Sequence, residues 1–126
     1  MTRELKVYID DILESLDIVI GYVKDIDEEE FNSSIQLQDA VIRRFEIIGE
    51  AAKQVPDSFR NKHSHIPWRK MAGLRDVLIH HYFGVSISRI WKMIKNELAQ
   101  VKNDISVLIN EWDKEDENID FSSGAE

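Results

Sequence analysis

The sequence contains no cysteine, which excludes disulfide bonds and thiolate metal ligands and is compatible with a reducing cytoplasm. It has no apolar run long enough to span a bilayer, and its first ten residues lack the basic-then-apolar order of a signal peptide. Only two prolines and five glycines occur in 126 residues, and no segment alternates convincingly between polar and apolar residues. These absences indicate a single cytoplasmic domain that is mainly helical.

Apolar residues instead recur at intervals of three and four, which is the spacing of amphipathic helices. The pattern predicts helices over residues 3–26, 34–55, 67–82 and 86–112. Residues that favour the start of a helix precede or open these segments, namely Thr2, Ser34, Pro67 and Ser86. The acidic "DIDEEEFNSS" is interpreted as a break, and "PDSFRNKHSHIP" as a connector with room for one short helical turn. We therefore expect an all-α bundle of four main helices plus a short connector helix.

The end of the chain differs in composition from the rest. Residues 113–126, "DKEDENIDFSSGAE", are strongly acidic and finish with serine and glycine. Such a segment has too few apolar residues to pack, so we expect a helical domain over residues 1–112 followed by a disordered acidic tail.

The net charge of −8 argues against a generic nucleic-acid binder, but the charge is unevenly distributed. Residues 53–75 contain six basic residues against one acidic residue, and residues 86–102 contain four against one. These two basic segments bracket "GLRDVLIHHYFG", residues 73–84, so a polyanion can dock there. On charge alone, however, an ordinary solvated surface is the better explanation.

The bracketed stretch combines apolar residues with side chains suited to phosphodiester chemistry. His80 can accept or donate a proton near neutral pH. Arg75 offers a planar fork of donors that matches a phosphate and can stabilise the added negative charge of a transition state. A histidine and an arginine directed at one phosphodiester are the minimum for RNA cleavage without a metal.

The spacing of these two residues raises a geometric difficulty. Five residues at 3.6 residues per turn place Arg75 and His80 about 140° apart on a straight helix. For both to reach one phosphate, the helix has to end or distort near His80, or two protomers have to contribute one residue each. By itself, the R-x4-H spacing is better explained by a capping histidine and a surface arginine near a helix end.

Two blocks of sequence change that balance. "IPWRKMAGLRDVLIHHYFGVSISRIW" resembles the signature of HEPN-domain proteins of the HepT type, in which an R-x4-H-x-Y motif follows a Pro-Trp helix start. Arg75, His80 and Tyr82 match its three fixed positions, while His81 falls on the variable one. The upstream "RRFEIIGEAAK", residues 43–53, is similar to the second-helix block of that family. The resemblance extends over about residues 3–112.

The resemblance implies a small helical homodimer that acts as a metal-independent endoribonuclease toxin on tRNA or mRNA, without a cofactor. Arg75 and His80 would be the catalytic residues, with a supporting role for Asp76, where many relatives have asparagine. It also implies a type VII toxin–antitoxin pair, in which an antitoxin of the MntA type, with a nucleotidyltransferase fold, transfers AMP to Tyr82 and silences the nuclease.

Other functions stay open at this point. The chain can instead be a catalytically silent helical module that binds a nucleotide or a partner, or the silenced partner of its antitoxin with Tyr82 as acceptor. The intact motif favours the ribonuclease and the modification acceptor over the silent module.

Other polar and aromatic residues have simpler explanations. His63 and His65 have the H-x-H spacing of metal ligands but no carboxylate nearby in sequence. Glu46 and Glu50 lie close to Arg43 and Arg44, which favours a buried or interface ion-pair cluster over acid–base chemistry. Three tryptophans fall on apolar stripes and are interpreted as core or dimer contacts, namely Trp68, Trp91 and Trp112.

Overall fold

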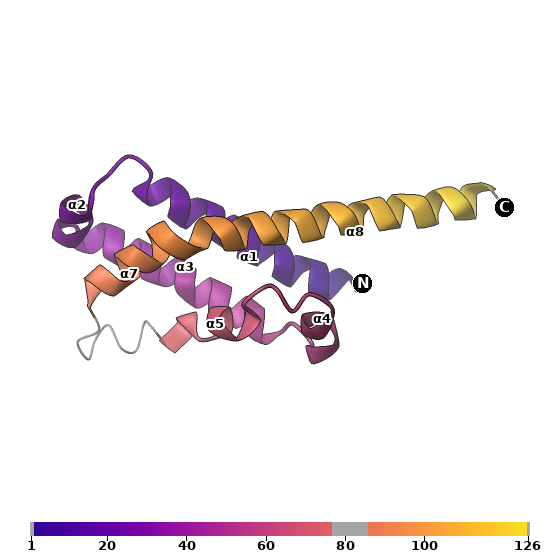
Figure 1. Ribbon diagram of the computed structural model, residues 1–126, viewed down its shortest axis with the longest axis horizontal. Helices are drawn as coiled ribbons and strands as arrows, with labels where there is room; N and C mark the ends of the chain where they lie inside the picture. Colours follow the sequence, from indigo (N-terminus) through magenta and orange to yellow (C-terminus); the bar gives the residue numbers. More distant parts are fainter. Residues whose placement is uncertain (1, 77–85, 126) are drawn as a thin grey trace.

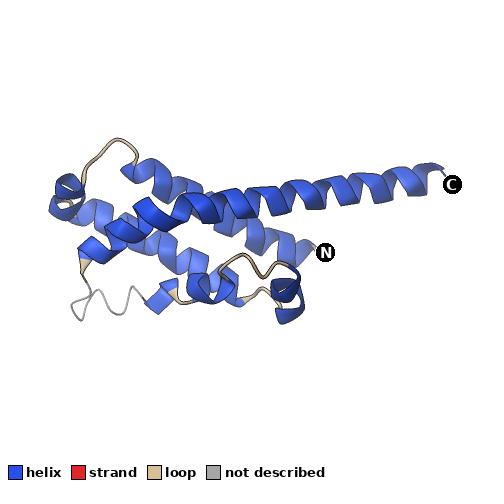
Figure 2. Ribbon diagram, in the orientation of Figure 1, coloured by secondary structure: helices blue, strands red, loops and turns tan. Residues whose placement is uncertain are grey.

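The computed structural model describes residues 2–76 and 86–125, and every regular element in these ranges is a helix (Figure 2). The elements in chain order are α1 (Arg3–Val23), α2 (Glu28–Ser33), α3 (Ile35–Lys53), α4 (Asp57–Lys62), α5 (Trp68–Ala72), α7 (Ile87–Met93), the π-helix η1 (Ile94–Leu98) and α8 (Ala99–Ala125). The expected all-α fold is confirmed for this part of the chain.

The long helices form the body of the molecule (Figure 1). α1 packs along α3 and also contacts η1 and α8, and these helices share one hydrophobic core. α2 closes the bundle against α3 and α7, and α5 packs on α3. α7, η1 and α8 follow one another as a single rod, whose last turns extend past the other helices in Figure 1.

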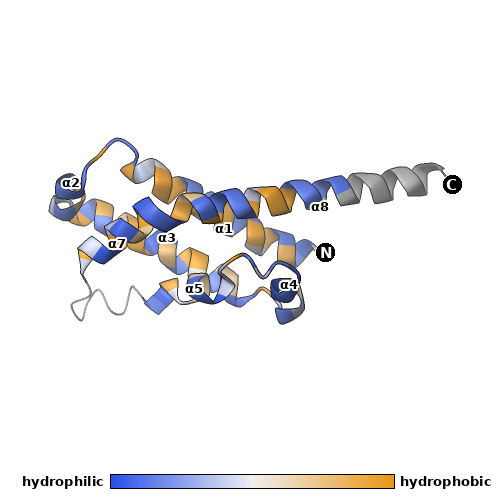
Figure 3. Cartoon of the chain, in the orientation of Figure 1, coloured by the Kyte–Doolittle hydropathy of each residue, from blue (hydrophilic) through white to orange (hydrophobic). Residues whose placement is uncertain are grey.

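The apolar stripes expected from the sequence form this core. Figure 3 shows hydrophobic and hydrophilic residues alternating along each long helix, as helices with one buried face require. The large side chains without solvent contact include Ile9, Ile12, Leu16, Phe45, Ile48 and Ile105. Burying each such side chain contributes about 1.5–3 kcal/mol, so the stripes hold the bundle together. Among the described residues, no helix is both long and apolar enough to cross a membrane.

The first two predicted helices are confirmed with small changes at their ends. α1 begins after Thr2, whose hydroxyl accepts a hydrogen bond from the amide of Leu5 at 3.1 Å. α3 begins after Ser34, whose hydroxyl accepts from the amide of Leu37 at 3.1 Å. These bonds satisfy amide groups that have no partner inside the helix, which is why both caps were recognisable.

The acidic segment between these helices is more ordered than expected. It contains α2, where the sequence predicted only a break. The side chain of Asp27 accepts a hydrogen bond from the amide of Glu30 at 2.9 Å and caps the helix. Phe31 is fully buried and lies 5.5 Å from the ring of Trp91, measured between ring centroids. A cap and one aromatic anchor therefore stabilise a helix of six residues.

The prediction of one continuous helix over residues 67–82 is wrong. α5 ends at Ala72, Gly73 forms a turn, and residues 74–76 are helical again. Pro67 occupies the N-cap of α5, one position before its expected place. Residues 77–82 of this prediction lie outside the described residues.

The fourth helix is also divided, because the π-helix η1 separates α7 from α8. Ser86 holds the N-cap position, although its side chain makes no capping hydrogen bond. α8 continues to Ala125, well beyond the expected end near Trp112. The division into a domain over residues 1–112 and an acidic tail stays a prediction.

Candidate functional site

The described part of the site is built where α3 meets the chain around Arg75. Gly49 is buried in α3, and a Cβ atom added to it would lie 2.8 Å from the backbone nitrogen of Arg75 and 3.0 Å from its Cβ. Atoms cannot approach that closely, so any side chain at position 49 would push the two segments apart. The glycine thus allows the backbone of Arg75 to rest directly on α3.

The residue after this glycine holds the arginine side chain. Glu50 Oε1 lies 3.0 Å from Arg75 Nη1, and both side chains are about half exposed, at 49% and 47%. A guanidinium has five N–H donors, so an ion pair at one nitrogen leaves others for a ligand. Gly49 therefore fixes the arginine's backbone and Glu50 orients its charged group.

The structure brings together only part of the motif. Asp76 is exposed, and its amide donates a hydrogen bond to the carbonyl of Gly73 at 3.0 Å. His80, the neighbouring His81 and Tyr82 lie outside the described residues. The described site therefore consists of Arg75 with its supports on α3, next to Asp76.

The two glutamates on α3, Glu46 and Glu50, form ion pairs with different arginines. Glu46 pairs with Arg43, with 3.0 Å between Oε2 and Nη1. The expected ion pair is therefore present, but it is not buried, because the Arg43 side chain is 65% exposed. Glu50 was expected to join the same cluster, but its partner is Arg75, 25 positions further along the chain. The sequence contained both residues of this pair, yet only the fold shows that they meet.

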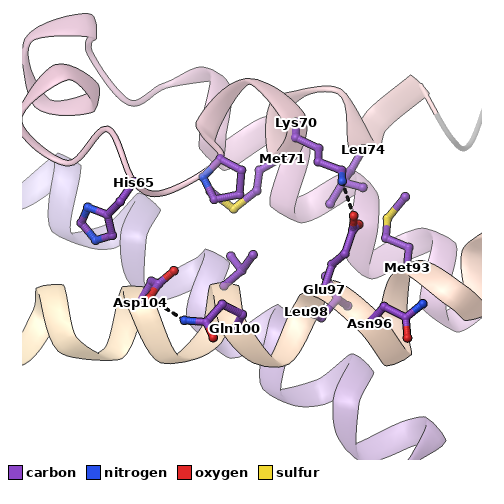
Figure 4. Close-up of a pocket in the computed structure, with 12 residues that line it drawn as sticks. His65, Lys70, Met71, Leu74, Met93, Asn96, Glu97, Leu98, Gln100 and Asp104 are labelled. Carbon is purple, nitrogen blue, oxygen red and sulfur yellow. Dashed lines mark hydrogen bonds and ion pairs between the residues drawn. The ribbon is translucent and has the colours of Figure 1, made fainter.

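A cavity of about 340 Å³ opens beside the site, between the connector and α5 on one side and η1 and α8 on the other. Figure 4 shows Lys70 and Glu97 extending toward each other across it, and they form an ion pair. Much of the lining is apolar, with Met71, Leu74 and Met93 among the contributors. This lining suits an apolar group better than a phosphate.

The remaining candidates have structural explanations. The ring centroids of His63 and Phe59 lie 4.6 Å apart. The backbone carbonyl of His63 accepts a hydrogen bond from Trp68 Nε1. Within residues 2–76 and 86–125, no group of three or more potential ligands is placed to hold a metal ion. Trp68 and Trp112 belong to the core, as expected, and Trp91 packs on Phe31.

These observations define a class of protein, a small helical bundle with a half-exposed arginine where two helical segments meet. That arginine can contact an anion. Comparison with known families makes the assignment specific. The family described as "Ribonuclease HepT-like" matches residues 12–108. The chain belongs to this HepT-like ribonuclease family.

Individual relatives agree with the assignment. A "Gamma-glutamylcyclotransferase and putative RNase" of Methanocaldococcus jannaschii is 45% identical over 118 residues, which cover 94% of this chain but 53% of that protein. A "Putative RNase" of the same organism is 40% identical, covering 92% of this chain and 96% of the relative. The "Probable ribonuclease HepT" of Thermococcus cleftensis is 43% identical, covering 81% and 93%. No solved structure matches the chain.

Proposed function

We propose that this protein is a metal-independent endoribonuclease and the toxin of a type VII toxin–antitoxin pair. The observation that carries the proposal is the position of Arg75, the proposed catalytic arginine. Its backbone lies against Gly49 and its guanidinium pairs with Glu50. Both supports fall in the block that resembles the family's second helix. Membership of the HepT-like ribonuclease family supports the same activity. Relatives that this chain covers nearly in full have RNase names only, whereas the cyclotransferase name belongs to a longer relative of which the chain covers 53%.

The proposed reaction uses the 2′-hydroxyl of RNA as the nucleophile. Its oxygen forms a bond to the adjacent phosphorus, and the bond from phosphorus to the 5′-oxygen breaks. His80 accepts the proton of the attacking hydroxyl or gives one to the leaving oxygen. Arg75 donates hydrogen bonds to the phosphoryl oxygens, whose negative charge increases in the transition state. A supporting role for Asp76 beside Arg75 is part of this proposal.

The test is cleavage of RNA by the purified protein in the presence of a chelator. The parent should cleave at the same rate with and without EDTA, and His80→Ala should abolish cleavage without loss of helical circular dichroism. Loss of activity with EDTA would contradict the metal-free reaction. A folded parent that binds RNA but never cleaves it would favour the silent binding module instead.

The proposed enzyme is a homodimer. Arg75 and His80 diverge by about 140° on a straight helix, so one residue from each of two protomers solves the geometry. Two motifs at one cleft would also bring two copies of the basic segments together. Light scattering should give twice the chain mass at micromolar concentration, and a stable monomer there would contradict the dimer.

Control of the toxin is proposed to act through Tyr82. A partner of the MntA type would join the tyrosine oxygen to the α-phosphorus of ATP and release pyrophosphate. The attached AMP adds a phosphodiester charge and a bulky nucleoside beside the catalytic residues, and so blocks the substrate phosphate. Tyr82→Phe keeps the ring and removes the acceptor oxygen, so intact mass should show no AMP on this variant. Full neutralisation of Tyr82→Phe by the antitoxin would rule the modification out as the mechanism.

A further inference from the structure

A second hollow, of about 300 Å³, lies on the surface formed by α5, α7 and η1. We call it the basic hollow, and its charged lining consists of Lys70, Arg89, Lys92 and Glu97. It shares Lys70, Met93, Asn96 and Glu97 with the apolar cavity of Figure 4, so the two hollows adjoin at the Lys70–Glu97 ion pair. Lys70 precedes Arg75 by five positions and Arg89 follows Ser86 by three, so the hollow is built from both sides of residues 77–85.

The basic residues of segments 53–75 and 86–102 fall into two groups. One group is occupied by the fold itself. Arg60 donates hydrogen bonds to the carbonyls of Ala52 and Val55 at the end of α3. Lys95 donates to the carbonyl of Val23 at 3.0 Å and lies 4.8 Å from the ring centroid of Trp91. Both side chains bond to backbone carbonyls of the fold, although Lys95 is itself exposed.

The other group is available to a ligand. Arg89 and Lys92 are exposed, and because they lie three positions apart on α7 they share one face of the helix. No ion pair or hydrogen bond to either side chain occurs within the part of the chain that the structure describes. Lys70 is compensated by Glu97, so the hollow keeps the two positive charges of α7.

Some exposed cations have carboxylate partners, since Lys102 pairs with Asp17 and Arg43 with Glu46. Others, such as Lys24, Lys53 and Arg69, form no ion pair within the described part of the chain. Arg89 and Lys92 differ from these because they lie one turn apart on α7 and line the same hollow. In a protein of net charge −8, two adjacent uncompensated positive charges attract a polyanion more strongly than a single isolated one does. The ligand that fits is a phosphodiester chain, whose charges repeat along its length.

We propose that Arg89 and Lys92 bind the RNA backbone beside the scissile phosphodiester, with the basic hollow as the docking surface for the flanking nucleotides. The inference rests on the proposed ribonuclease function and adds the residues that bind the substrate without reacting with it. Arg89 and Lys92 hold phosphates, while Arg75 and His80 act on the bond that breaks. Because phosphates are alike, the hollow contributes affinity and not sequence preference.

Binding is measured separately from cleavage, by fluorescence anisotropy of labelled single-stranded RNA with His80→Ala protein over a series of salt concentrations. In this background, Arg89→Gln/Lys92→Gln should bind about tenfold more weakly, and the slope of log K against log salt should fall by about 1.4, at about 0.7 per lost phosphate contact. The matched control is Arg43→Gln/Lys102→Gln, which removes the same two side-chain types at paired positions away from the hollow. It should bind as the background protein does.

The outcomes separate this inference from the function on which it rests. If both double variants bind alike while the parent cleaves RNA, the basic hollow is wrong and the ribonuclease stands. If the parent does not cleave, the binding comparison still tests the hollow. Normal RNA binding by Arg89→Gln/Lys92→Gln with loss of neutralisation by the antitoxin would make this surface a protein interface and overturn the proposal. The charge-preserving Arg89→Lys/Lys92→Arg should restore binding in every salt condition.

Discussion

Arg75 and the pair Arg89–Lys92 lie on opposite sides of residues 77–85 in the chain, and their surroundings differ. The backbone of Arg75 packs against α3 so closely that Gly49 has no space for a Cβ atom. Its guanidinium forms an ion pair with Glu50. Arg89 and Lys92 project from α7 into solvent without such supports. A group that stabilises a transition state has to be held in place before the reaction, whereas a group that attracts a polyanion needs only its charge.

The largest effect is expected at the supported arginine. Arg75→Ala should lower the rate of RNA cleavage by about 10²–10³, the loss typical for removing one donor to a transition-state oxyanion. The side chain is 47% exposed, so the melting temperature should change little. Single-turnover cleavage and thermal unfolding measure the two quantities. Arg43→Ala, which removes the arginine paired with Glu46, is the control and should cleave as the parent does. Parent-like cleavage by Arg75→Ala would remove the arginine from the mechanism.

The next effect comes from the glycine contact. Gly49→Ala places a methyl group 2.8 Å from the backbone nitrogen of Arg75, and relieving that overlap should cost about 1–3 kcal/mol of unfolding free energy. Cleavage should fall with it, because the backbone of Arg75 moves. Gly21→Ala is the matched control, since nothing lies within 4 Å of the added Cβ. In α1 that change should stabilise by up to about 1 kcal/mol. Denaturant unfolding that shows the same change for both variants would disprove the close contact.

A smaller effect is expected at the carboxylate that orients the arginine. Glu50→Gln should lower kcat by about tenfold with little change in KM, because the guanidinium loses its ionic partner while substrate binding elsewhere is kept. Stability should change by less than about 1 kcal/mol, as for other exposed ion pairs. Glu46→Gln, one turn earlier on α3, breaks the other ion pair of this helix and should leave kcat unchanged. Equal kinetics of the two variants would show that Glu50 does not position Arg75.

The elements that the sequence predicted well are those determined by their own residues. α1 and α3 are long enough for the apolar spacing to repeat several times, and Thr2 and Ser34 cap them through residues three positions away. α2 was missed because six residues are too few to show a period, and because the Phe31–Trp91 contact, which adds to the Asp27 cap, joins residues far apart in the sequence. η1 is a small change in winding that leaves the apolar spacing nearly intact, so the pattern concealed it.

The candidate site shows the same limit. Arg75 was identifiable from the motif, and its supports Gly49 and Glu50 fell within a block that the sequence had already singled out. The pairing between them was not predictable, because Arg43 and Arg44 are closer in sequence to Glu50 and offered a local partner. The close approach of Gly49 on α3 to the backbone of Arg75 likewise joins residues far apart in the sequence, which no local pattern records. Charge counts located the basic segments, but only the fold separates the cations that hold helices from those that face solvent.

The smallest effect is expected where charge is kept and shape is changed. Arg89→Lys should cleave RNA within about twofold of the parent, because an exposed side chain that contacts a phosphate as a point charge needs no fixed geometry. Arg75→Lys should lose most of the activity that Arg75→Ala loses, since an ammonium group cannot replace the planar fork that pairs with Glu50 and the phosphate together. Cleavage rates of the two variants, measured side by side at low and at high salt, show whether only Arg75 needs the shape of the guanidinium. An equal loss in both would mean that the arginines on the two sides of residues 77–85 act in the same way, and the contrast between a positioned group and an attracting one would not hold.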